Sequence, residues 1–284
     1  MLTNNGNPEG LFRAAWMESG GVSPVGNVSK LQPNFDFIAS ETGCASARDV
    51  VECLRQAPPE VIKAAMDKTP TFLSFTRLLL EGKVADIPFI IGACEDEGTL
   101  FSLSSLNITT AREAASYIKT TYFPLAPETD ITRLLELYPS NPALGSPFGT
   151  GNAFAFTPEF KRLAAFQGDL IFQATRRLLL NQRSGKQDAR SFLNERNKIT
   201  GLGATHTTEL ANVFGGGDMT DFLVRFANHL DPNGGPEPHW PAYNPASPQL
   251  IAFVEGSTPL AVISDTFRQE ANDFLMYLGL AQPL

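Results

Sequence analysis

Three short apolar runs that alternate with long helical patterns constrain the fold of this chain more than any other feature. The runs span Phe12 to Met17, Ile87 to Gly92 and Ser191 to Leu193. The second run is apolar on both faces, as the strands of a parallel sheet tend to be. Because strands separated by helices are typical of layered α/β proteins, the sequence predicts an α/β fold with a mostly parallel sheet.

The longest helical pattern begins at Thr157, which is a good N-cap and is followed by Pro158 at the first helical position. Apolar residues continue with helical spacing to Leu180, Gly185 ends the run, and Gly168 weakens it in the middle. Further helices are predicted over Ala47 to Arg55, Pro59 to Asp67, Ala111 to Lys119, Asp130 to Leu137, Asp221 to Leu230 and Ser264 to Leu278.

Composition narrows the class of protein. The chain has 284 residues, of which 43% are hydrophobic and 10% aromatic, and this is enough to bury a sizeable core. Disordered chains are usually less aromatic and carry more than the 18% of charged residues found here. The net charge of -8, without any Lys/Arg-rich run, argues against a nucleic-acid partner.

The sequence contains neither a membrane-spanning segment nor a signal peptide. No stretch approaches the roughly 18 to 20 apolar residues that cross a bilayer. The segment Met1 to Asn7 lacks the basic and apolar regions of a signal peptide, so either the protein is cytosolic or its natural N-terminus is not in this sequence. The N-glycosylation patterns at Asn27 and Asn107 give weak support to a secreted origin.

The three cysteines allow one disulfide. Cys44 and Cys53 are close in sequence, and a bridge between them would close a small loop in an oxidising compartment. Cys94 is left over. Because it follows an apolar run, we interpret it as a buried thiol at the end of a strand rather than a reactive one.

Two loops after predicted strands carry candidate chemistry, because active groups of parallel sheets lie beyond the carboxyl ends of strands. Glu97 follows the second apolar run, where a carboxylate can orient a histidine if water is partly excluded; the alternative is a solvated acidic turn. His206 follows two glycines and can accept and return a proton, although a structural histidine is the alternative. His229 and His239 are interpreted as structural.

Several motifs in a fixed order carry a family resemblance. They are Leu11 to Gly20, Gly43-Cys44 with Cys53 to Arg55, Asp96 to Thr99, Gly145 to Phe148, Thr157 to Arg162, and Trp240 to Tyr243. Through them the chain resembles the C-terminal part of the type-B carboxylesterase/lipase family. The similarity is greatest to its fungal lipases and sterol- or carotenoid-ester hydrolases.

The resemblance implies a partial α/β-hydrolase domain over residues 1–284 that lacks the N-terminal strands. It also implies a serine acyl-enzyme mechanism in the full-length family, a lipid or small carboxylic ester as substrate, no cofactor or metal, and secretion. Carried over to this sequence, Glu97 would be the triad acid, His206 the triad base, and Cys44 and Cys53 a disulfide. The order acid then histidine agrees with α/β-hydrolases generally.

The nucleophile of that mechanism is missing from the sequence. It belongs in a Gly-x-Ser-x-Gly turn upstream of the acid. The two glycine pairs with this spacing have Pro8 and Pro147 at their centres. Ser19 has Met17 where the first glycine belongs, so we interpret it as a structural residue at a strand end. Gly215 to Gly217 is predicted to be a flexible surface loop, not a source of oxyanion donors.

Two functions follow from these residues. In the first, the chain is a fragment of a serine ester hydrolase that keeps Glu97 and His206 but is inactive as given. In the second, it is a non-catalytic α/β-hydrolase-like binding protein. Retention of both the acid and the histidine favours the first.

Overall fold

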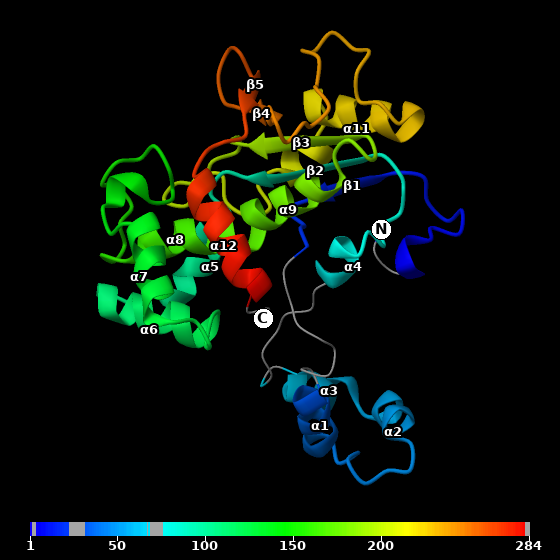
Figure 1. Ribbon diagram of the computed structural model, residues 1–284, viewed down its shortest axis with the longest axis vertical. Coiled ribbons are helices and arrows are strands. Elements are labelled where there is room, and N and C mark those ends of the chain that lie inside the picture. Colours follow the sequence, from blue (N-terminus) through cyan, green and yellow to red (C-terminus); the bar gives the residue numbers. More distant parts are fainter. Residues whose placement is uncertain (2–3, 23–31, 67, 69–75, 282–284) are drawn as a thin grey trace.

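A five-stranded sheet forms the centre of the computed structural model, which describes residues 1, 4–22, 32–66, 68 and 76–281 (Figure 1). The strands lie in the order β1 (Ala15–Glu18), β2 (Phe89–Cys94), β3 (Ala189–Asn194), β4 (Gln249–Phe253) and β5 (Leu260–Ser264). The first four are parallel and β5 is antiparallel to β4. The predicted α/β fold with a mostly parallel sheet is therefore confirmed.

The pairing register of β2 and β3 places the carboxyl ends of these two strands side by side. Every residue of β2 and β3 is buried, as expected for strands covered on both faces. Gly92 pairs with Phe192, and a Cβ atom on Gly92 would lie 2.3 Å from the Phe192 ring. Glycine is therefore required there. Cys94 ends β2 opposite Asn194, so the loops that follow the two strands start side by side.

Helices cover both faces of the sheet, and a group of three lies apart from it. The helices of the described residues are α1 (Gln32–Glu41), α2 (Val50–Gln56), α3 (Pro59–Met66), α4 (Thr76–Leu80), α5 (Gly98–Ser102), α6 (Ala111–Thr121), α7 (Glu128–Leu137), α8 (Phe160–Gly168), α9 (Ala174–Arg183), α10 (Leu210–Phe214), α11 (Asp218–His229) and α12 (Gln269–Ala281). Helices α8, α9 and α12 lie on one face and α11 on the other (Figure 1).

Alternate residues of β2 pack into two separate hydrophobic cores on opposite faces of the sheet. Phe89 and Ile91 belong to the larger core, which is formed with α6 to α9 and α12. Ile90 belongs to the smaller core, which contains Trp240 and the apolar face of α11. The alternation follows from the strand period of two and explains why the whole run is apolar.

Several predicted helix boundaries are wrong. The helices predicted from Ala47 and Asp221 begin at Val50 and Asp218. The pattern from Thr157 becomes helical only at Phe160, and a π-helical turn at Asp169–Gln173 separates α8 from α9. The helix predicted from Ser264 starts at Gln269, because Ser264 is the last residue of β5.

Cys44 and Cys53 form the disulfide that the family resemblance implied. It joins the turn after α1 to α2, and these helices lie with α3 apart from the sheet (Figure 1). The side chain of Asp49 caps α2 by accepting a hydrogen bond from the Glu52 N–H. Asn107 is exposed, whereas Asn27 lies outside the described residues. In the part of the chain that the structure describes, no helix has the length and apolar character needed to cross a membrane.

Candidate active site

The loops after β2 and β3 bring Glu97 and His206 together. Nδ1 of His206 lies 2.7 Å from Oε2 of Glu97. The Glu97 side chain is 1% exposed and that of His206 30%. The carboxyl group is therefore shielded from water while one side of the imidazole remains accessible, and the two residues named from the sequence form one contact.

A close crossing of two helices fixes Glu97. Gly98 begins α5, and a Cβ atom on it would lie 2.0 Å from the Ala164 carbonyl oxygen and 2.5 Å from the backbone nitrogen of Gly168. Helices α5 and α8 thus touch backbone to backbone directly beside Glu97. The glycine that weakened the helical pattern at position 168 lies at this contact.

Three donors surround the Glu97 carboxylate. It accepts hydrogen bonds from His206, from the Cys94 N–H at 2.7 Å and from the Ser19 hydroxyl. Burial raises the pKa of Glu97, and these donors oppose that rise by stabilising the ionised form. The hydrogen bond to Glu97 in turn raises the pKa of His206. A carboxylate on Nδ1 fixes the tautomer in which Nε2 exchanges the proton.

Two phenylalanines cover the His206 ring. The ring centroids of Phe101, on α5, and Phe172, in the π-helical turn, each lie 5.2 Å from the imidazole centroid. Gln173 of the same turn donates to the Cys94 carbonyl at 3.0 Å, which anchors the turn to the end of β2. Among the described residues, none is hydrogen-bonded to Nε2 of His206, so this nitrogen can meet a reacting group.

Asp96 has no separate role in the predicted site, but it holds the His206 loop in place. Its carboxylate accepts from the Ser146 hydroxyl at 2.7 Å, the Phe148 N–H at 2.8 Å and the Ala204 N–H at 3.1 Å. A Cβ atom on Gly203 would lie 2.0 Å from Oδ2 of Asp96. Burial, followed by the charge of Glu95, raises the pKa of Asp96 to about 6. Asp96 thus ties the loop that carries His206 to the segment around Phe148.

The comparisons with known proteins agree with this architecture. The chain is 36% identical to Lipase 4 of Diutina rugosa across 86% of its own length and 49% of that protein. It is 32% identical to Secreted lipase 1 of Botryotinia fuckeliana, with 94% and 52% covered. No family model matches the chain.

Two solved structures share the fold. One is EstA of Aspergillus niger, with a TM-score of 0.78 and 20% identity over 100% of this chain and 62% of EstA. The other is carboxylesterase EST55 of Geobacillus stearothermophilus, with a TM-score of 0.68 and 22% identity over 93% and 59%. The chain belongs to the type-B carboxylesterase/lipase family. It has the α/β-hydrolase fold and spans about half the length of the curated relatives it matches.

In this carboxylesterase-family chain, Ser19 contacts the acid rather than the histidine. It follows β1, is buried and has a φ of 53°, a left-handed conformation uncommon outside glycine. Its hydroxyl donates to Glu97 and lies 3.2 Å from Oε1 of Glu209. The Ser19 hydroxyl is therefore engaged by carboxyl groups at the end of β1.

The other glycine and histidine candidates take no part in the Glu97–His206 contact. Gly215 to Gly217 are exposed and connect α10 to α11, and His229 and His239 are exposed. Cys94 is buried at the last position of β2, as predicted. Within the described ranges, no group of three His, Cys, Asp or Glu side chains is arranged to hold a metal ion.

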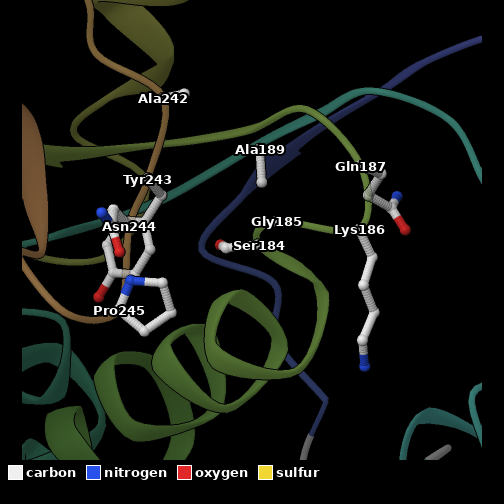
Figure 2. Close-up of a pocket in the computed structure, with 9 residues that line it drawn as sticks. All are labelled: Ser184, Gly185, Lys186, Gln187, Ala189, Ala242, Tyr243, Asn244 and Pro245. Carbon is white, nitrogen blue, oxygen red and sulfur yellow. The ribbon is translucent and has the colours of Figure 1, made fainter.

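A separate pocket of about 730 Å³ opens at the amino end of β3 (Figure 2). It lies between the turn at residues 184–187, which precedes the strand, and the segment at residues 242–245. Because His206 follows the opposite, carboxyl end of β3, this pocket is not part of the Glu97–His206 site.

Proposed function

We propose that this chain supplies the acid and the base of a serine relay that hydrolyses a carboxylic ester. His206 would take the proton of an attacking hydroxyl through Nε2 and return it to the leaving group, while Glu97 orients the ring. The 2.7 Å contact between the buried Glu97 carboxylate and Nδ1 of His206 is the observation that carries this proposal. It also favours catalysis over a purely binding role, which needs no such pair.

The attacking hydroxyl would come from a segment outside the 284 residues. The sequence has no Gly-x-Ser-x-Gly turn, and the Ser19 hydroxyl is hydrogen-bonded to Glu97. An imidazole can activate only a hydroxyl held within about 3 Å. We therefore propose that the 284-residue chain by itself does not turn over esters.

An ester with an apolar acyl chain fits the surroundings of His206. Phe101, which covers the imidazole, is 40% exposed, and its neighbours Leu100 and Leu103 are also exposed. The relatives named lipases support the same substrate class. Secretion, which would let the Cys44–Cys53 bond persist, is supported by a relative named as a secreted lipase.

Fluorophosphonate labelling and hydrolysis of p-nitrophenyl esters test the proposal. The purified chain should neither be labelled nor turn over ester. A chimera that joins it to the preceding half of Lipase 4 of Diutina rugosa should do both. In the chimera, His206→Ala should abolish turnover, whereas His229→Ala, at an exposed histidine, should not change it.

Two results would contradict the proposal. Turnover by the chain alone that is lost on His206→Ala would mean that it contains its own nucleophile. A chimera that is labelled and folded but keeps its turnover after His206→Ala would remove the proposed base.

A further inference from the structure

The π-helical turn beside His206 ends in a buried glutamine that contacts both the sheet and a buried arginine. Gln173 is the last residue of this turn and is 1% exposed. Its side-chain amide donates to the Cys94 carbonyl at 3.0 Å and accepts from Nε of Arg176 at 3.2 Å. The amide of Gln173 therefore joins the end of β2 to the first turn of α9.

The partners of Gln173 allow only one orientation of its amide group. A guanidinium can only donate hydrogen bonds, and a backbone carbonyl can only accept them. The amide oxygen must therefore face Arg176, and the amide nitrogen must face Cys94. Arg176 is itself held in place, because it donates to both carboxylate oxygens of Asp265 at 2.8 Å and to the Ser191 hydroxyl at 2.7 Å.

The backbone that Gln173 contacts also supports the proposed acid. The Cys94 N–H donates to Glu97 at 2.7 Å, while the Cys94 carbonyl accepts from Gln173. Cys94 is the last residue of β2, where the chain leaves the sheet toward Glu97. A hydrogen bond on each side of Cys94 thus fixes the backbone at this point.

The residue before Gln173 covers the imidazole. The ring centroid of Phe172 lies 5.2 Å from that of His206. The Thr175 hydroxyl donates to the Ile171 carbonyl at 2.6 Å, and such a bond to the backbone four residues earlier often bends a helix. Because the turn departs from regular helix here, its anchor on β2 through Gln173 decides where the Phe172 ring lies.

We propose that Gln173 is a positioning residue of the candidate active site. Through Cys94 it fixes the backbone that supports Glu97. Through the π-helical turn it holds Phe172 against the His206 ring. The importance of Gln173 for catalysis rests on the proposed function, whereas its hydrogen bonds do not depend on that function.

Two substitutions at Gln173 separate its hydrogen bond to Cys94 from side-chain packing. Gln173→Leu fills a similar volume but can neither donate nor accept. Gln173→Glu keeps the shape of the side chain and, ionised beside Arg176, accepts from that guanidinium but cannot donate to the Cys94 carbonyl. The matched control is Gln182→Leu, at a half-buried glutamine on α9.

NMR of the purified chain reports on both contacts. In each Gln173 variant, the carbonyl-carbon resonance of Cys94 should move because the carbonyl loses its donor. The ring-proton resonances of His206 should also move, because the Phe172 ring is no longer held against the imidazole. Gln182→Leu should leave these resonances unchanged.

The pKa of His206 gives a further readout in Gln173→Leu, which adds no charge. The hydrogen bond to Glu97 is the main reason that this pKa is raised. If the support of Glu97 loosens, the pKa of His206 should fall by about 0.5 units toward its ordinary value of about 6.5. The exposed His229 and His239 serve as internal controls.

Two results would overturn the proposal. One is a Gln173→Glu variant whose Cys94 and His206 resonances are unchanged, and this result decides even if the leucine variant does not fold. The other is a folded Gln173→Leu variant that keeps the His206 pKa of the unsubstituted chain. Because these readouts need no ester turnover, an inactive chimera would remove the proposed function and leave them standing. Unchanged resonances in an active chimera would remove only the role of Gln173.

Discussion

Asp265→Asn tests the ion-pair network that joins α9 to the far edge of the sheet. Asp265 directly follows β5, and its side chain is completely buried. It accepts two hydrogen bonds of 2.8 Å from Arg176, two of 2.7 and 3.1 Å from Arg177, and one of 2.9 Å from the Tyr243 hydroxyl. Asparagine keeps the shape of the side chain but removes the charge that balances the two guanidinium groups.

Two independent arguments give the loss of unfolding free energy expected for Asp265→Asn. Burial alone would raise the pKa of Asp265, but Arg176 and Arg177 outweigh it and lower the pKa from 3.8 to about 2. A lowering of this size corresponds to about 2 to 3 kcal/mol, at about 1.36 kcal/mol per pKa unit. Removing one partner of a buried ion pair costs about 3 to 5 kcal/mol. Because asparagine retains one acceptor oxygen, we expect a loss of about 3 kcal/mol.

Urea denaturation at pH 7, followed by circular dichroism, measures the loss. Asp273→Asn is a matched control, because Asp273 is exposed on the neighbouring α12, and it should change the free energy of unfolding by less than about 0.5 kcal/mol. A loss below about 1 kcal/mol for Asp265→Asn would refute the reasoning, since the arginines would then not depend on this carboxylate.

The same variant has a defined pH dependence. Since the pKa of Asp265 is depressed in the folded state, its contribution to stability is complete above pH ~4 and is lost as the pH falls toward ~2. The difference between the unsubstituted chain and Asp265→Asn should therefore shrink over this window. A difference that stays constant from pH 5 to the lowest pH at which the chain folds would contradict the assignment of the pKa to Asp265.

Two further substitutions test the site itself. Gly98→Ala should lower the free energy of unfolding in urea by at least about 2 kcal/mol, because the new Cβ atom would lie 2.0 Å from a backbone atom. The control Gly20→Ala, whose nearest atom is at 3.8 Å, should change it by less than about 0.5 kcal/mol, and equal effects would contradict the close helix crossing. Glu97→Gln should lower the pKa of His206, measured by NMR, because the hydrogen bond to the Glu97 carboxylate is the main reason that this pKa is raised. The control Glu95→Gln should leave the pKa of His206 unchanged. If Glu97→Gln does not lower it, the imidazole does not depend on Glu97.

The sequence was sufficient to predict the place of the site because that place depends on local patterns. An apolar run with no polar face indicates a central parallel strand, and the carboxyl ends of such strands share one edge. Glu97 follows such a run, and His206 lies in the loop after the third predicted strand. Their contact at 2.7 Å therefore needed only the level register that pairs Cys94 with Asn194, together with the family resemblance.

The features that were missed depend on tertiary contacts. Strand β5 lies at the edge of the sheet, where only Leu260 of its residues is buried, although Leu260 to Ile263 form an apolar run. The π-helical turn at Asp169–Gln173 lies beside the Gly98–Gly168 crossing and is held by Gln173 on the Cys94 carbonyl. A single-sequence helical pattern contains no signal for either contact.

Contacts within this chain set the geometry of the proposed acid and base, Glu97 and His206. The acid is held by the Cys94 N–H, Ser19 and the crossing at Gly98, all within this chain. The loop with the histidine is held by Asp96, and its ring by two phenylalanines. Because these contacts are buried and lie within this chain, we expect Glu97 and His206 to adopt this geometry without the serine. A segment carrying that serine would then need only to dock beside Nε2, without rearranging the pair that activates it.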